Sequence, residues 1–238
     1  RAIHQNSFTN PPTEAWEGNF HTQQQSYYAL VKMDLYELGG RQDPAYLDQA
    51  RDLLEWVVRN GYDAADPHFY LKYTTKTGEW DRGFYPEFNM INVTGLLCYS
   101  HYRPRADWQA IAEKVLARIT GTVPFQAGKT QNLYSSSYLA LKLLDCYDTL
   151  GEERFLKLAR QVVDRADEAL WDEEYGGLLQ FVHRAGGRPR GDVPPAEQGQ
   201  PMLANLAANW DGKFYWVHTE ALYALLLSYY HTRQPWAM

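Results

Sequence analysis

The sequence predicts an all-α protein of the (α/α)6 type, a toroid of helical hairpins. Two kinds of apolar pattern alternate along the 238-residue chain. Some segments carry one narrow apolar stripe at i, i+3 and i+4 spacing, which is typical of a helix with one face in water. The segments between them are apolar on nearly every side, as expected for helices enclosed by neighbours. Short turns separate the segments, so successive helices should pack as antiparallel hairpins.

Three segments have the narrow stripe and are expected to be outer helices. They begin near Tyr46, Trp108 and Phe155. Four segments are apolar all round and are expected to be inner helices, at residues 23–38, 89–102, 134–150 and 216–230. The inner segments resemble one another when they are aligned on a small residue in each. Their unequal spacing indicates a repeated structural role with loops of variable length, because a fixed-period array would keep its spacing.

Composition narrows the classes of partner. The net charge is −6, and no cluster of Lys and Arg forms a basic stripe, so nucleic acid is not an expected partner. No apolar run reaches the roughly 18 residues of a membrane span. Cys98 and Cys146 lie in apolar helical patterns, which favours buried free thiols over a disulfide and a reducing, cytoplasmic location. We expect a monomer or a homodimer.

No cofactor is expected. The sequence has no glycine-rich phosphate loop, and its histidines do not have the spacing of metal ligands, so no metal site is predicted.

The starts of the inner helices carry polar and aromatic side chains, although the bodies of these helices are apolar. If the inner helices run parallel, these starts meet at one end of the toroid. Amide, imidazole and aromatic groups that converge in this way suit a small-molecule sugar, because hydroxyls need donors and acceptors and sugar rings stack on aromatic faces. The expected substrate-binding residues are His21, Glu87, Asn89, Asn132, Tyr134, Tyr215 and Trp216.

Two further residues are candidates for catalysis. His218 and Glu220 lie past the first residues of an apolar run, where a cap is not needed. A buried Glu is rarely without a partner, so a ligand or a paired group is implied. The alternatives are that polar residues at helix starts are caps and that His218 is a hydrogen-bonded core histidine.

Two stretches carry a resemblance to the N-acylglucosamine 2-epimerase superfamily, which includes cellobiose 2-epimerases and mannose or aldose–ketose isomerases. The first runs from Trp171-Asp172 to Gly176-Gly177-Leu178, and the second is Lys213-Phe214-Tyr215-Trp216-Val217-His218-Thr219-Glu220-Ala221-Leu222. Their order and spacing are similar to the family pattern over residues 130–230.

The resemblance implies an (α/α)6 barrel and proton abstraction beside the carbonyl of a ring-opened sugar. Trp216 would stack on the sugar, while His218 and Glu220 would contact its hydroxyls or reacting carbon. Histidines suit this chemistry because their pKa lies near neutrality.

We expect residues 1–238 to form one hairpin toroid that is incomplete. Seven helices fit into this length, whereas a barrel of twelve helices needs about 350 residues. The toroid is then truncated, lacks some segments, or belongs to a reduced relative.

Three functions follow from these patterns. The first is a sugar epimerase or isomerase that acts on a free mono- or disaccharide through an enediolate. The second is a glycoside hydrolase or lyase on the same scaffold, which needs paired carboxylates such as Glu87 and Glu220, with Asp81 as a third. The third is a non-catalytic sugar-binding relative. It is favoured by Gln131–Ser135, which lacks the histidine that the family carries there.

Overall fold

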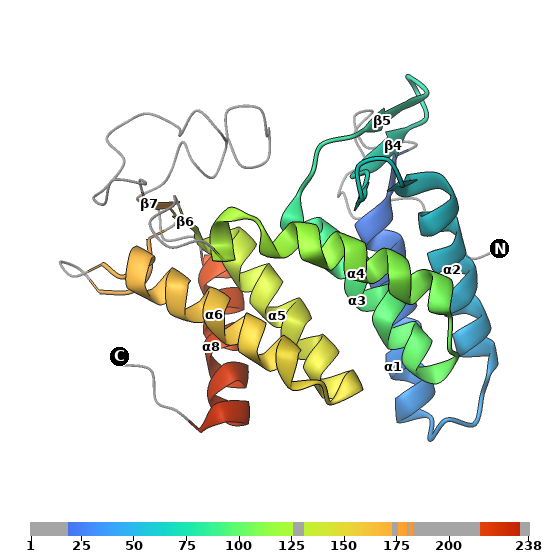
Figure 1. Cartoon of the computed structure of the whole chain (residues 1–238). Coiled ribbons are helices and arrows are strands. Elements are labelled where there is room, and N and C mark those ends of the chain that lie inside the picture. Colours follow the sequence, from blue (N-terminus) through green and yellow to red (C-terminus); the bar gives the residue numbers. More distant parts are fainter. Residues whose placement is uncertain (1–18, 126–130, 173–175, 180, 183–214, 234–238) are drawn as a thin grey trace. The chain divides into compact units, whose positions relative to one another are not determined.

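The computed structural model describes residues 19–125, 131–172, 176–179, 181–182 and 215–233. Seven α-helices lie in this part of the chain (Figure 1), and each corresponds to a helix predicted from the sequence. The inner helices begin one to three residues earlier than expected. The helices are α1 (Thr22–Leu38), α2 (Ala45–Gly61), α3 (Pro86–Tyr102), α4 (Ala106–Thr120), α5 (Leu133–Leu150), α6 (Glu153–Leu170) and α8 (Tyr215–Thr232).

The chain divides into two compact units, Arg1–Ile119 and Thr120–Met238. The expectation that residues 1–238 form a single domain stays a prediction. In the first unit, α1 and α2 form a hairpin, and α3 packs against both.

Short strands lie beside the helices of the first unit. The strands β1 (Asn19–His21), β4 (Lys72–Thr74) and β5 (Glu79–Asp81) form an antiparallel sheet in the order β1-β4-β5. A second pair, β2 (Tyr62–Asp63) and β3 (His68–Phe69), follows α2. The sequence analysis did not predict these strands.

In the second unit, α5 and α6 form a hairpin, and α8 packs against both. A short 3-10 helix, η1 (Val123–Phe125), and strand β6 (Gln131–Asn132) precede α5. Strand β6 pairs with β7 (Phe181–Val182), which follows the turn after α6. That turn is closed by hydrogen bonds from Asp172 N to Gly177 O and from Gly176 N to Asp172 O, both 2.8 Å long.

Burial confirms the predicted types of α6, an outer helix, and α3, an inner helix. The buried residues of α6 are the six predicted from its stripe, beginning with Phe155 and ending with Leu170. On the inner helix α3, every residue from Glu87 to Ser100 is buried. Both cysteines are buried free thiols, as expected.

Two inner helices are less enclosed than their sequences predict. Helix α1 leaves Val31 and Leu38 exposed, and α8 leaves Leu222, Tyr223, Leu226, Tyr229 and Tyr230 exposed. Within the described part of each unit, α1 packs mainly against α2 and α3, and α8 against α5 and α6. An apolar surface all round a helix therefore did not predict complete enclosure here.

A close approach explains one glycine. A Cβ added at Gly61, the last residue of α2, would lie 2.5 Å from Thr22 Cγ2. Glycine therefore allows the end of α2 to lie against the start of α1. The residue after the helix is Tyr62, in an extended conformation. Gly151 caps the end of α5, with φ of 70° in the left-handed region.

Candidate functional site

Neighbouring inner helices run parallel within each unit. In the first unit, Ser26 Oγ donates to Asn92 Oδ1 at 2.7 Å, and Asn92 Nδ2 donates to Thr22 Oγ1 at 3.3 Å, which brings the first turns of α1 and α3 together. In the second unit, His231 Nε2 lies 3.0 Å from Asp148 Oδ1, so the last turns of α5 and α8 lie together. Each pair of helix starts therefore lies at one end of its unit, and the meeting of all four starts stays a prediction.

A row of ionisable side chains crosses the β1-β4-β5 sheet beside the start of α1. His21 is paired in register with Lys72, and Lys72 with Asp81. Directly paired residues of an antiparallel sheet point to the same face, so the three side chains form one row. The opposite face carries Phe20, Tyr73 and Trp80, and the Phe20 and Trp80 rings lie close to Trp56 of α2.

His21 is neutral at pH 7. Burial, and secondarily the positive charge of Lys72, lower its pKa to about 4, although Asp81 opposes the shift. The neutral imidazole Nδ1 lies 3.1 Å from Gln23 Nε2, an amide that can only donate. We therefore assign Nδ1 as the acceptor and the ring proton to Nε2.

Tyr85, at the start of α3, lies near two carboxylates. Its hydroxyl donates to Asp81 Oδ2 at 3.4 Å. Burial raises the pKa of Tyr85 to about 12, and the negative charges of Asp81 and Glu87 add to this effect. The phenol therefore stays protonated in the physiological range, and Glu87, which is only 1% exposed, lies in the same neighbourhood.

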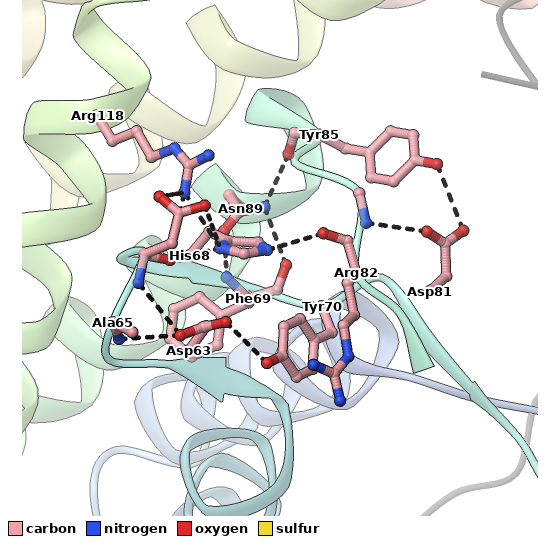
Figure 2. A network of polar contacts seen from close by, with 12 residues as sticks. Asp63, Ala65, His68, Phe69, Tyr70, Asp81, Arg82, Tyr85, Asn89 and Arg118 are labelled. Atoms are coloured by element: carbon pink, nitrogen blue, oxygen red, sulfur yellow. Dashed lines mark hydrogen bonds and ion pairs between the residues drawn. The ribbon is translucent and has the colours of Figure 1, made fainter. Parts of the chain in front are cut away.

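Backbone contacts hold the segment that carries Asp81 and Tyr85 (Figure 2). His68 Nε2 donates to Arg82 O at 3.0 Å, Gly83 N donates to Asp81 Oδ1 at 3.1 Å, and Asn89 Nδ2 donates to Tyr85 O at 3.0 Å. The other ring nitrogen of His68, Nδ1, lies 2.5 Å from the Asp66 carbonyl oxygen and 3.1 Å from Arg118 Nη1 of α4. Asp81, Arg82 and Tyr85 are therefore each held by a hydrogen bond with another residue.

The structure gives Asn89 a structural role. Its Oδ1 accepts from Phe69 N at 2.6 Å, and its Nδ2 donates to Phe69 O as well as to Tyr85 O. This side chain therefore clamps β3 to the start of α3. That Asn89 also binds substrate stays a prediction.

Two buried polar atoms at helix starts lack a hydrogen-bond partner among the described residues. They are Gln23 Oε1 on α1 and Ser136 Oγ on α5. Gln23 is 8% exposed and Ser136 is 2% exposed. A buried oxygen without a partner costs about 1–3 kcal/mol, so a ligand hydroxyl or a water molecule is expected at each position.

In the second unit, His218 connects the two sequence motifs that carry the family resemblance. Its Nε2 lies 2.8 Å from the Leu178 carbonyl oxygen, which can only accept. The ring proton is therefore on Nε2, and Nδ1 is the basic nitrogen. The turn after α6 thus fixes both the tautomer and the orientation of the imidazole on α8, which is how a general base is usually held.

The other predicted residues of this unit have different surroundings. Asn132 caps α5, with its Oδ1 accepting from Tyr134 N at 2.9 Å and Ser135 N at 3.4 Å. Tyr134 is buried, and its ring lies 4.7 Å from the Tyr138 ring. Glu220 is half-buried, one residue beyond the exposed Thr219. The side chains of Tyr215 and Trp216, and residues Lys213 and Phe214, lie outside the described part.

Lys72, Tyr85 and the Asp81–Tyr85 segment were not predicted as a group. Lys72 and Asp81 are brought to His21 by the pairing of three-residue strands, and only weak sequence signals mark such short strands. The sequence suggested Asp81 only as a third carboxylate for a glycoside hydrolase. The aromatic alternation at Tyr73 and Trp80 is the signal that could have revealed the sheet.

Between α5, α6 and α8 there is a small cavity of about 20 Å³, lined mainly by apolar side chains that include Leu133, Val163 and Ala224. It has room for about one water molecule and not for a sugar. Over the described residues, no helix is long and apolar enough to cross a membrane. The same part of the chain contains no group of three His, Cys, Asp or Glu side chains that could hold a metal ion.

Neither a protein-family model nor a curated protein sequence matches this chain. Solved structures do match it. An α-mannanase of glycoside hydrolase family 76 from Bacteroides thetaiotaomicron is 18% identical, with a TM-score of 0.61 over 94% of this chain and 57% of its own. An unsaturated glucuronyl hydrolase from Bacillus sp. GL1 is 14% identical, with a TM-score of 0.58 over 95% of this chain and 62% of its own. A D-mannose isomerase is 12% identical, with a TM-score of 0.53 over 90% and 59%.

These likenesses confirm the predicted fold class, an all-α fold of the (α/α)6-barrel type. The matched proteins are carbohydrate-acting enzymes, and their reactions differ. The chain spans 57–62% of the lengths of these three structures. At these low identities the comparison shows the fold alone, and membership of the epimerase superfamily remains a resemblance.

Proposed function

We propose that the protein is a sugar 2-epimerase or aldose–ketose isomerase that acts on a free mono- or disaccharide. The observation that carries this proposal is the hydrogen bond between His218 and the Leu178 carbonyl. It joins the two motifs of the family resemblance and orients the imidazole of His218. A D-mannose isomerase among the structural neighbours supports the same class of reaction.

In this mechanism, His218 Nδ1 removes the proton from C2 of the ring-opened sugar. The electron pair of the C–H bond forms the C1–C2 double bond of an enediolate, and the former carbonyl oxygen takes the negative charge. Transfer of the proton on O2 to O1, with return of a proton from His218 to C1, forms the C2 carbonyl and gives the ketose. Return of a proton to the opposite face of C2 re-forms the C1 carbonyl and gives the epimer. Glu220, on the same first turns of α8, is assigned to a hydroxyl of the sugar. Trp216 is assigned to stacking on the sugar ring, and Tyr215 to substrate binding.

The test is conversion of mannose, glucose, N-acetylmannosamine and cellobiose in deuterated water. The expected result is a C2 epimer or a ketose that carries deuterium at the carbon that was reprotonated. His218→Asn keeps a donor for the Leu178 carbonyl but removes the base, and should lower kcat by at least about a hundredfold, the usual contribution of general-base catalysis. His231→Asn, on the far end of α8, is the matched control and should keep full activity.

Two results would contradict the proposal. One is turnover without incorporation of deuterium, because proton abstraction beside a carbonyl exposes the carbon to solvent exchange. The other is equal activity of His218→Asn and the wild-type protein.

The second candidate function is a glycoside hydrolase, which the carboxylates of the first unit favour. Asp81 accepts a hydrogen bond from the Tyr85 phenol, and the charge of Glu87 also raises the pKa of that phenol, so both carboxylates lie near Tyr85. A pair of carboxylates is what most glycosidases use. Glu87→Gln should abolish hydrolysis of α-1,6-mannooligosaccharides or unsaturated glucuronyl disaccharides under this function. Under the isomerase function, the same variant should only weaken sugar binding.

A further inference from the structure

The β1-β4-β5 sheet has a polar face and an aromatic face. The aromatic face packs on Trp56 of α2, with the Trp56 and Trp80 rings 6.0 Å apart. The polar face presents His21, Lys72 and Asp81 beside the first turns of α1 and α3. The sheet is therefore held on one side by packing and offers a row of donors and acceptors on the other.

The acceptor and donor groups of this row are held in place. Asp81 Oδ1 accepts from Gly83 N, and Asp81 Oδ2 accepts from the Tyr85 hydroxyl. A Cβ at Gly83 would lie 2.6 Å from the Tyr85 ring, so the ring fills the space that glycine leaves. Binding groups that are positioned in advance lose little conformational entropy when a ligand arrives.

One buried atom at this place is suited to a ligand donor. Gln23 Oε1 has no hydrogen-bond partner among the described residues, while Nε2 of the same side chain bonds to His21. Gln23 is 92% buried, which follows from its exposed fraction of 8%. A sugar hydroxyl can donate to such an oxygen and accept from a neighbouring group at the same time.

The charges of the row indicate the class of ligand. Lys72 and Asp81 are neighbours of opposite sign, and His21 is neutral at pH 7. Glu87 adds acidic character close by. An anionic sugar would therefore meet one cation and two carboxyl groups, whereas a neutral sugar meets donors and acceptors without repulsion.

We propose that Tyr85, Asp81, Gln23 and His21 form a binding site for the hydroxyl groups of a neutral sugar, within the first unit. This inference rests on the proposed function for its ligand class, and it adds Tyr85 and Gln23 as residues that contact the sugar. Asn89 and His68 position the site through the backbone of Arg82 and Tyr85.

The experiment measures binding of methyl α-mannoside, a neutral sugar that cannot open its ring, by calorimetry and by saturation-transfer NMR. Tyr85→Phe removes one hydroxyl and Gln23→Met removes the amide at nearly constant volume. Each variant should weaken binding about tenfold, the usual effect of one lost hydrogen bond. The anionic methyl β-glucuronide should bind at least about tenfold more weakly than the mannoside.

Tyr70→Phe is the matched control, because the Tyr70 hydroxyl also donates to an aspartate, Asp63 Oδ2, at 2.9 Å. It should leave binding of the mannoside unchanged. Thermal unfolding of each variant shows whether it is folded. Unchanged binding in folded Tyr85→Phe and Gln23→Met overturns the inference, and so does tighter binding of the glucuronide.

These experiments distinguish failure of the binding site from failure of the proposed function. Methyl α-mannoside cannot open its ring, so its binding is measured independently of any sugar conversion. If the wild-type protein converts no sugar but binds the mannoside in a manner that depends on Tyr85, the proposed function fails and this site stands. If the protein is an isomerase and Tyr85→Phe binds and turns over sugar normally, the site fails and the proposed function stands.

Discussion

Acid should destabilise this protein through His21. The pKa of His21 is about 4 in the folded chain, against a value of 6.5 for an unperturbed imidazole, mainly because the ring is buried. Between these two pH values the unfolded chain binds a proton that the folded chain does not bind. The free energy of unfolding therefore falls as the pH falls. The contribution is fully present above pH 6.5 and is lost as the pH approaches 4.

The size of this effect follows from the shift. A difference of 2.5 pH units between the folded and unfolded pKa values corresponds to about 3 kcal/mol at pH 4 and about 2 kcal/mol at pH 5. That is a large part of the stability of an ordinary domain. Burial decides the magnitude, since His21 is only 9% exposed.

Urea denaturation at pH 4, 5, 6 and 7, followed by circular dichroism, measures this contribution. His21→Gln keeps an acceptor for Gln23 Nε2 but cannot titrate, so its stability should fall by about 2 kcal/mol less than that of the wild type between pH 7 and pH 5. The exposed His101 supplies the control, and His101→Gln should follow the wild-type curve. Parallel pH curves for His21→Gln and the wild type would refute the reasoning.

Three further changes test the packing. Gly61→Ala should cost about 1–3 kcal/mol by overpacking against the Thr22 methyl group, and Thr22→Ser in the same chain should restore most of it in urea denaturation. Without such rescue, the clash is not the cause. Leu143→Ala, in the core of α5, should cost about 2–5 kcal/mol. Leu226→Ala, at 56% exposure on α8, should cost less than about 1 kcal/mol, and equal losses would contradict the burial of α5. Asn89→Ala removes three hydrogen bonds to the backbone of Phe69 and Tyr85 and should cost about 2–4 kcal/mol; a loss below about 1 kcal/mol would exclude the clamp.

The helices could be predicted from the sequence because their apolar patterns extend over four or more turns. The stripe of α6 from Phe155 to Leu170 identified every buried residue of that helix. The parallel course of α1 and α3 was a condition in the sequence argument, and the contacts of Asn92 with Ser26 and Thr22 show it. These features depend on local periodicity, which one sequence displays directly.

The candidate sites could be predicted only in part. His21, Glu87 and His218 were found because they are polar residues near the ends of apolar runs. Lys72 and Tyr85 were missed because strand pairing and a clamped loop bring them to His21, and neither has a periodic signal. Asn89 was expected to contact a sugar, but its amide holds the backbone. The residue type shows that a side chain is polar, but it does not show which group that side chain bonds to.

The hydrogen bond between His218 and the Leu178 carbonyl depends on the backbone conformation of the turn and not on the Leu178 side chain. Replacing Leu178 by another residue leaves its carbonyl in place, so the contact is insensitive to side-chain substitution at that position. Gly176 and Gly177 have φ of 69° and 80°, a region that costs other residues strain. A change at either glycine would strain the turn and shift the carbonyl that His218 bonds to. Under the proposed function, such a substitution would lower activity although it removes no functional group.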